Sequence, residues 1–477
     1  MDIFALLQTF GSNAWIYGGS FILILSLLVF VHEWGHYIVA RMCGVRVETF
    51  SVGFGREIFG RTDSHGTRWK VSLIPLGGYV KMFGDSDPAS AGKDEKVKKL
   101  SKKDREVAFF SKSVAKRSGI VFAGPAINYI FAIILLAGLY MFHGQPVTPP
   151  QASAVIEGSA AAKAGFEPHD MVVAIDGKKI NSFEDIRREM MIALDTEKVF
   201  SVQRGDEDLE ISATPEKVTS EDRFGFSHSR GLLGLISPQH AVPLQFIVKV
   251  DGRDYSKLDA LAADATDAQK EVYTAKQEAR VEKIRKRLVG KLDRTFAIEI
   301  DRGAKIDTLF ISPLKDQNAD LIAGAQDGKP VILMLAAAES KSFVRRGVFD
   351  AIGSAVHESY VITVGTFEAL GQMITGTRSA KELGGIIRIG AIAGDMAQQG
   401  LIALILFTAL LSINLGLINL FPIPLLDGGH LVFYAIEAIQ GKPVPDQYQE
   451  YAFRTGFALL IALMAFANIN DLLQLFL

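Results

Sequence analysis

Four long apolar segments constrain the fold of this chain more than any other feature. They cover residues 15–40, 120–142, 401–421 and 453–475, and each is long enough to cross the roughly 30 Å hydrocarbon core of a bilayer as a helix. Inside a bilayer the backbone has no water to bond, so a spanning segment of this kind folds as a helix. The sequence therefore predicts a polytopic α-helical membrane protein with four transmembrane helices.

The composition fits a membrane protein that also carries sizeable soluble parts. The chain has 477 residues, 49% of them hydrophobic, and its formal net charge of −2 gives no reason to expect a nucleic-acid partner. Cys43 is the only cysteine, so no intramolecular disulfide is possible. The first apolar segment follows a tail without Lys or Arg, and we expect it to remain in the mature protein rather than to be a cleaved signal peptide.

The distribution of basic residues predicts the orientation in the membrane. The first connection, residues 41–117, is rich in Lys and Arg, whereas the N-terminal tail has neither. By the positive-inside rule this loop is cytoplasmic and the N-terminus lies outside. Alternation then places the long connection 143–400 and the C-terminus outside, and the turn 440–454 inside. For the lysine-rich part of the first loop, a solvated linker face is an equally good explanation.

The first loop also has a β pattern shortly after the first span. Residues 45–51 and 69–73 are rich in β-forming side chains, and glycine-containing turns follow each of them, which predicts a β-hairpin. Apolar side chains are numerous enough here for the hairpin to associate with the membrane on its cytoplasmic side. An exposed edge of the hairpin offers main-chain hydrogen bonds to an extended peptide. A hairpin that only packs against the spans is the alternative.

A metal-binding motif stands at the end of the first span. His32 and His36 are four residues apart, so on a helix their imidazoles share a face and suit one metal ion, with Glu33 beside the open coordination position. An ionisable side chain at membrane depth costs roughly 2.5 to 3.5 kcal/mol and is normally kept only for function. The motif therefore predicts a zinc hydrolase site within the membrane.

The end of the third span supplies what the first span lacks. Pro422 and Pro424 break the helix, and irregular backbone at membrane depth is tolerated only where it lines a cavity or is buried in protein. Asp427 follows them as a third metal ligand, which leaves zinc a fourth position for water, as in catalytic sites. For His430 we expect a structural or supporting role. The first turns of the second span contain Gly124, which permits close helix packing, and Asn128, which can hydrogen-bond to a neighbouring helix. We therefore interpret this span as a structural scaffold.

The outer connection contains one recognisable module. Residues 151–216 show a strand, a Gly-Ser turn, a short Ala-rich helix, a strand ending in Asp-Gly, a helix and a hairpin, an order that resembles a PDZ domain. Residues 224–335 suggest a second, diverged PDZ-like module with a helical insertion. In it, the Gly-Leu-Leu-Gly-Leu sequence at 231–235 resembles a PDZ carboxylate-binding loop, and residues 295–312 suggest a strand pair that turns at 301–303. An unrelated spacer is the alternative. Residues 342–400 have a pattern typical of amphipathic helices, lying on the outer membrane surface or against the spans.

Together these features resemble the site-2 protease family of intramembrane metalloproteases. The resemblance rests on His-Glu-x-x-His in the first span, on Asn-x-x-Pro-x-Pro-x-x-Asp-Gly at the end of the third, on the PDZ pattern between the second and third spans, and on the Gly-Phe-Gly and Gly-Gly-Tyr-Val-Lys-Met-Phe-Gly stretches of the first loop. It implies zinc (Zn²⁺) held by His32, His36 and Asp427, with Glu33 as catalytic base. Further residues are expected to lie along the substrate: Asn419, Pro422, Pro424, Gly77, Gly78 and Tyr79.

The resemblance also implies partners and a location. Substrates would be single-span membrane proteins, namely anti-sigma factors already trimmed by a first protease, and signal-peptide remnants, with the PDZ region screening out substrates that still carry a large outer domain. The protein would sit in a bacterial inner membrane, with both termini and the PDZ region periplasmic and the active site towards the cytoplasm. The chain is expected to divide into eight segments. They are the first span with the zinc motif (1–42), the cytoplasmic loop with the hairpin (43–117), the second span (118–143), the PDZ domain (151–216), the second PDZ-like module (224–335), the amphipathic helices (342–400), the third span with the Asp427 motif (401–439) and the fourth span (453–477).

Two other functions compete with proteolysis. A catalytically inactive, PDZ-bearing membrane scaffold would keep the metal site only for structure, but it would have no need of Glu33 as a base. A metal transporter would need several polar spans along a path, whereas only two spans here carry ligands. Four further histidines lack the spacing of ligands and are expected to face solvent: His65, His143, His169 and His240.

Overall fold

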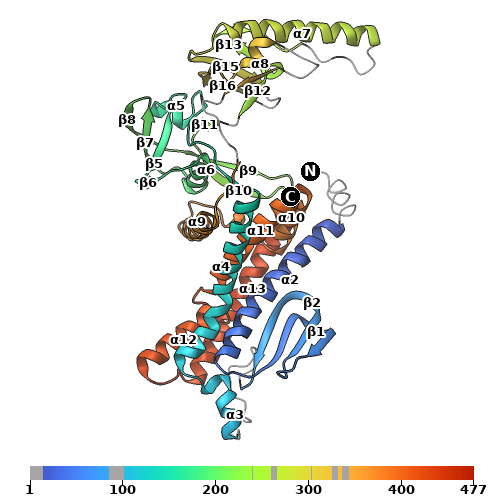
Figure 1. Cartoon of the computed structure of the whole chain (residues 1–477), viewed down its shortest axis with the longest axis vertical. Coiled ribbons are helices and arrows are strands. Elements are labelled where there is room, and N and C mark those ends of the chain that lie inside the picture. The colour runs from blue at the N-terminus through green and yellow to red at the C-terminus, as the bar shows by residue number, and fades with distance from the viewer. Residues whose placement is uncertain are drawn as a thin grey trace. The chain divides into compact units, whose positions relative to one another are not determined.

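The computed structural model describes residues 14–84, 101–238, 240–258, 261, 266–301, 303, 305–324, 331–335 and 343–476. The chain divides into two compact units (Figure 1). The first, here the membrane unit, comprises Met1–His143, Glu221–His228 and Arg345–Leu477. The second, here the β-rich unit, comprises Gly144–Ser220 and Ser229–Val344. Part of the lysine-rich loop and the N-terminal tail lie outside the described residues.

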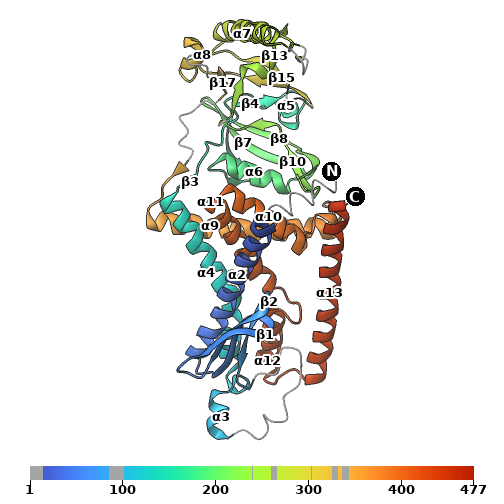
Figure 2. The same ribbon diagram turned by 90° about the vertical axis from the view of Figure 1, so that its right-hand side faces the viewer.

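Four helices of the membrane unit are long and apolar enough to cross a bilayer, within the part of the chain that the structure describes. The shortest has 19 residues, which at 1.5 Å per residue spans about 28 Å. The prediction of four transmembrane helices is confirmed, and Figures 1 and 2 show them running lengthwise through the unit. They are α2 (Ala14–Met42), α4 (Val114–Phe142), α11 (Leu401–Asn419) and α13 (Asp446–Phe476).

Helix α4 packs closely against two of the other spans. A Cβ atom on Gly35 of α2 would lie 2.4 Å from the main-chain oxygen of Ala123, and one on Gly416 of α11 would lie 2.9 Å from that of Pro125. Side chains at either position would therefore push the helices apart. Because lipid tails are as apolar as leucine, such close backbone contact, rather than the hydrophobic effect, holds membrane helices together.

The hairpin expected in the first loop is present and longer than predicted. It consists of β1 (Val47–Thr62) and β2 (Arg68–Met82). Residues 49–52 pair with 78–81 on one side and with 68–71 on the other, while residues 57–62 pair with 68–72. Each strand thus folds back within itself, and the edges of the resulting small sheet are 57–62 and 78–82. Figure 1 shows this sheet beside α2.

Shorter helices complete the membrane unit. In the region 342–400, predicted to form amphipathic helices, α9 lies crosswise to α4 in both views (Figures 1 and 2). Whether α9 rests on the membrane surface stays a prediction. The bounds are α3 (Lys102–Val107), η2 (Phe109–Ser111), α9 (Val348–Thr375), η4 (Ala380–Glu382), α10 (Ile386–Gln399) and α12 (Asp427–Gln440).

The β-rich unit contains a four-stranded sheet in the order β6-β5-β7-β8. The elements between residues 154 and 213 follow the order predicted for residues 151–216: strand, short helix, strand, helix and hairpin. They are β4 (Ala154–Ile156), α5 (Ala160–Ala164), β5 (Met171–Ile175), β6 (Lys178–Lys179), α6 (Phe183–Ile192), β7 (Lys198–Arg204) and β8 (Glu207–Ala213). Two further strand pairs are β3 (Gln145–Pro146) with β18 (Phe343–Val344), and β9 (Glu216–Glu221) with β10 (Ser227–Leu232).

A second sheet has six strands in the order β11-β4-β16-β15-β13-β14. It includes a strand pair that turns near residue 303, as expected, and the helical insertion forms one long helix, α7. Strands β12 and β17 pair with each other in a separate two-stranded sheet. The elements of this part of the chain are β11 (Leu235–Ile236), β12 (Ala241–Pro243), η3 (Leu244–Phe246), β13 (Ile247–Val250), β14 (Arg253–Asp254), α7 (Asp267–Val289), β15 (Phe296–Asp301), β16 (Ile306–Ile311), α8 (Ala319–Ala323) and β17 (Ile332–Met334).

The two predicted modules share a strand. Strand β4 lies between β11 and β16, so it belongs to the six-stranded sheet although its sequence position is in the first module. Leu233, expected at the start of the second module, packs in the core of the first with Val155 of β4, while Ala154 of β4 packs in the other core. Because side chains alternate along a strand, one short strand serves both cores.

Candidate metal centre

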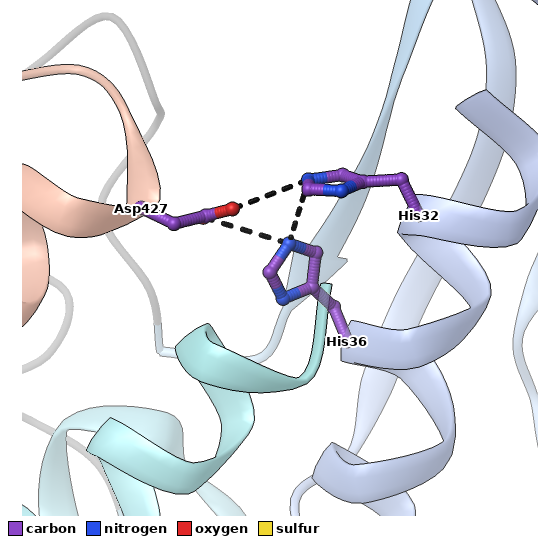
Figure 3. Close-up of side chains that lie close together, drawn as sticks. All are labelled: His32, His36 and Asp427. Carbon is purple, nitrogen blue, oxygen red and sulfur yellow. Dashed lines mark hydrogen bonds and ion pairs between the residues drawn. The ribbon is translucent and has the colours of Figure 1, made fainter. Parts of the chain in front are cut away.

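Two imidazoles converge on one face of α2. His32 and His36 are one helical turn apart, and their Nε2 atoms lie 3.3 Å from each other (Figure 3). The i, i+4 spacing brings them together, as predicted. His36 is buried, and its Nδ1 atom lies 2.9 Å from the main-chain oxygen of Ile120 in α4. With a proton on Nδ1 donated to that oxygen, the lone pair on Nε2 is free to bind a metal.

Asp427 comes to the same point from the far end of the chain. Its Oδ2 atom lies 3.2 Å from Nε2 of His32, and its Oδ1 atom lies 3.5 Å from Nε2 of His36 (Figure 3). The potential ligand atoms of the three residues all lie within 4.8 Å of one another. The structure thus brings together the three side chains that the sequence analysis selected as metal ligands.

The turn before α12 fixes the position of Asp427. The segment between α11 and α12 contains Leu425 at φ 84°, a left-handed conformation that is strained for a leucine and costs of order 1–3 kcal/mol. A Cβ atom on Gly428 would lie 2.3 Å from the main-chain oxygen of Leu420, and one on Gly429 would lie 2.4 Å from that of Ile423. The two glycines therefore allow the start of α12 to pack directly on the turn that precedes it.

The three side chains fit a zinc ion. Tetrahedral ligands at zinc distances of about 2.0–2.1 Å lie roughly 3.3–3.4 Å apart, which matches the 3.3 Å between the two Nε2 atoms. Asp427 approaches the two imidazoles with different oxygens, Oδ2 at 3.2 Å from His32 and Oδ1 at 3.5 Å from His36. The buried Oδ2 atom of Asp427 accepts no well-aligned hydrogen bond from the residues that the structure describes, although His32 is close. A buried carboxylate oxygen without a hydrogen-bond donor is available to bind a cation. Two histidines and one carboxylate also match the donor set of catalytic zinc.

Glu33 lies between the group formed by His32, His36 and Asp427 and the hairpin. Its carboxylate lies near the main chain of Val80, in the edge strand 78–82. A Cβ atom on Gly78 would lie 3.2 Å from Cγ of Glu33 and 2.6 Å from Cγ1 of Val29. The absence of a side chain at Gly78 therefore lets the edge of the sheet lie directly against α2.

The other residues expected along a substrate occupy three places. Asn419 ends α11, and Pro422 and Pro424 follow in the turn that leads to Asp427. Gly77, Gly78 and Tyr79 all lie in β2, where the Tyr79 ring stacks on Phe54 with ring centroids 6.2 Å apart. The structure thus places Gly78 next to Glu33.

The remaining histidines differ in their surroundings. His430 packs on Phe453, with ring centroids 5.2 Å apart, and is not among the metal-binding group of the described residues. His65 and His143 are exposed, as expected. The expectation for His169 was wrong, because its Nε2 atom lies 2.6 Å from the main-chain oxygen of Ser312 and the side chain is half-buried. His240 is also half-buried.

Comparison with known proteins decides the family. The sequence pattern of peptidase family M50 matches residues 20–463, which includes both histidines and Asp427. The chain belongs to peptidase family M50. This confirms the resemblance to site-2 proteases, and it makes the protein a membrane metalloprotease with zinc as its metal.

Members of family M50 resemble this chain over nearly its whole length. A protein of Agrobacterium fabrum named as a candidate zinc metalloprotease is 35% identical over 455 residues, covering 95% of both chains. The regulator of sigma E protease of Haemophilus influenzae is 33% identical, covering 96% of this chain and 98% of its own. The regulator of sigma-E protease RseP of Escherichia coli is 34% identical, with the same two coverages.

Sequence reasoning missed the part that α4 plays at this site. A Cβ atom on Gly124 would lie 2.3 Å from Nε2 of His36 and 2.9 Å from Cε1 of His32, so the imidazoles occupy the space beside this glycine. Ile120 contributes only its main-chain oxygen, for which no sequence pattern exists. The small residue at position 124 was the one available signal, and it is equally typical of ordinary helix packing.

Proposed function

We propose that this membrane metalloprotease is an intramembrane endopeptidase that cleaves single-span membrane proteins. The observation that carries the proposal is the convergence of His32, His36 and Asp427 on one point, with Glu33 on the same helix and the motif in a span-length segment. A site built only for structure would surround its metal with a fourth protein ligand. Among the described residues the group has three members, which leaves room for a reacting molecule.

In this proposal each residue has a defined task. His32, His36 and Asp427 would hold zinc, which when bound would make a water molecule a better nucleophile and polarise a peptide carbonyl. Glu33 would take up a proton from the water that attacks the carbonyl, and it would later give this proton to the departing amine.

Cleavage also requires that the substrate helix unwind, because a helix buries its carbonyl groups in its own hydrogen bonds. The edge strand 78–82 lies beside Glu33, so a substrate segment added to this edge would exchange helical hydrogen bonds for those of a sheet. Gly77, Gly78 and Tyr79 would then guide one side of the extended substrate. Asn419, Pro422 and Pro424 would contact its other side.

The outer parts of the chain suggest how substrates are selected. We propose that the β-rich unit contains PDZ-type modules that screen out substrates with large outer domains. Two relatives are named regulators of sigma-E protease, which supports anti-sigma factors, with signal-peptide remnants, as the substrate class. The bacterial relatives support an inner-membrane location. The basic first loop supports an orientation with both termini and the β-rich unit periplasmic and the metal centre towards the cytoplasm.

The test is cleavage of a model transmembrane peptide by the purified full-length protein and by Glu33→Gln. Loss of a general base lowers the rate by roughly 10²–10⁴, and the variant should still bind zinc because Glu33 is not a ligand. Glu450→Gln is the matched control, since Glu450 is exposed and pairs with Arg454 on α13. Equal cleavage by the wild type and Glu33→Gln would refute the catalytic assignment. A wild type that binds zinc without cleaving would favour the scaffold alternative.

A further inference from the structure

One face of α4 lies against the two imidazoles of the metal centre. Ile120, Gly124 and Asn128 are spaced four residues apart, so they form a single row on this helix. Ile120 offers its main-chain oxygen to His36, and Gly124 leaves space for both rings. The third member of the row, Asn128, is fully buried, and its amide group lies 3.0 Å from Nδ1 of His32.

The requirements of metal binding determine how this amide must be oriented. His32 and His36 both direct Nε2 towards Asp427, so both need the proton on Nδ1 and the lone pair on Nε2. A protonated Nδ1 needs an acceptor. His36 has one in the oxygen of Ile120, whereas His32 faces the Asn128 amide, whose nitrogen and oxygen positions are set by the hydrogen-bond network rather than observed.

The oxygen of the same amide supports this argument. With the nitrogen placed towards His32, Oδ1 of Asn128 is buried and has no donor within reach among the residues that the structure describes. A half-turn of the amide exchanges the two atoms and gives Nδ1 of His32 the acceptor that metal binding demands. The opposite arrangement would put the imidazole proton on Nε2, where it would block the metal.

We propose that Asn128 is a positioning residue for the metal centre. Its Oδ1 atom accepts a hydrogen bond from Nδ1 of His32, which fixes both the tautomer and the ring orientation of that ligand. The residue is itself held in place, because the hydroxyl of Ser412 in α11 donates to its main-chain oxygen at 2.8 Å. The inference rests on the proposed function in one respect, namely that His32 is a zinc ligand.

The test measures zinc affinity of the purified full-length protein by competition with a chelator, so it does not depend on proteolysis. Asn128→Leu keeps a similar side-chain size without an acceptor, and we expect it to bind zinc roughly 10–100-fold more weakly. Asn128→Asp keeps the oxygen and should bind zinc at least as tightly as the wild type. Thr408→Ala is the matched control, because it removes a buried hydroxyl of α11 that donates within its own helix to the main-chain oxygen of Leu404, and it should bind zinc as the wild type does.

Two results would overturn the proposal. Wild-type zinc affinity in Asn128→Leu would show that His32 needs no acceptor from α4. If Asn128→Leu fails to fold, Asn128→Asp provides the test. A tenfold loss of zinc affinity in Asn128→Asp would mean that the amide nitrogen, and not the oxygen, is the atom that His32 requires. Weaker zinc binding in Asn128→Leu together with a retained affinity in Asn128→Asp supports the positioning role even if the wild type cleaves no peptide.

Discussion

Gly124 allows the sharpest test of how closely α4 approaches the metal centre. A Cβ atom at this position would lie 2.3 Å from Nε2 and 2.5 Å from Cε1 of His36. Since ordinary contacts begin near 3.4 Å, the imidazole would have to move by about 1.1 Å. Metal–ligand distances tolerate only about 0.2 Å, so Gly124→Ala should abolish tight zinc binding and, with it, peptide cleavage.

The same helix provides a matched control. Gly119 of α4 has no atom within 4 Å of the position that a Cβ would take. Alanine is favoured over glycine in a helix interior by roughly 0.5–1 kcal/mol, so Gly119→Ala should raise the stability of the helix and leave zinc affinity unchanged. Zinc affinity and thermal unfolding of the two variants, measured side by side, separate the steric effect from the helix propensity. A Gly124→Ala protein with wild-type zinc affinity would contradict the packing described above.

Two further predictions concern the hairpin and α12. Burial alone would raise the pKa of Asp63, but hydrogen bonds from the Trp69 indole and from two main-chain amides hold the pKa below its usual value. The carboxylate therefore stabilises the hairpin turn above about pH 4. This stability is lost as the pH falls through the lowered pKa. The protection of residues 57–72 against hydrogen exchange, relative to the intrinsic exchange rate at each pH, should therefore fall on acidification in the wild type, but not in Asp63→Asn. Arg117 of α4 and Glu437 of α12 form an ion pair at 2.7 Å. Glu437→Gln should lower the free energy of unfolding by about 3 kcal/mol, because it leaves the partly buried Arg117 without its partner. Adding Arg117→Met should restore most of this loss.

Different results would contradict each of these. Identical acid sensitivity in the wild type and Asp63→Asn would show that the charge of this carboxylate does not hold the turn. Additive losses in the Arg117→Met and Glu437→Gln double variant would show that the two side chains do not act as a pair.

The features that sequence predicted were those with local signals. Length and hydropathy are enough to define four spans, and the spacing of His32 and His36 is enough to place two ligands on one helix face. Asp427 was identified because a carboxylate after two prolines completes the chemistry of a catalytic zinc site. Each of these inferences uses residue type and spacing, which a single sequence contains.

The features that sequence did not predict depend on contacts between distant segments. The acceptor for His36 is a backbone oxygen, and Asn128 is equally consistent with plain helix packing until its distance to His32 is known. The hairpin folds back within each strand, although its sequence only indicates two β segments. His169 contacts the backbone of Ser312, a neighbour that spacing along the chain does not reveal.

The sharing of β4 has a consequence for how the β-rich unit can change. Ala154 and Val155 are consecutive residues that serve different cores, so the strand has no outward face on which substitutions are free. A polar replacement at either position would weaken one core and disturb the other through the shared backbone. The two sheets should therefore melt in a single transition, and relatives can exchange these modules only as a pair.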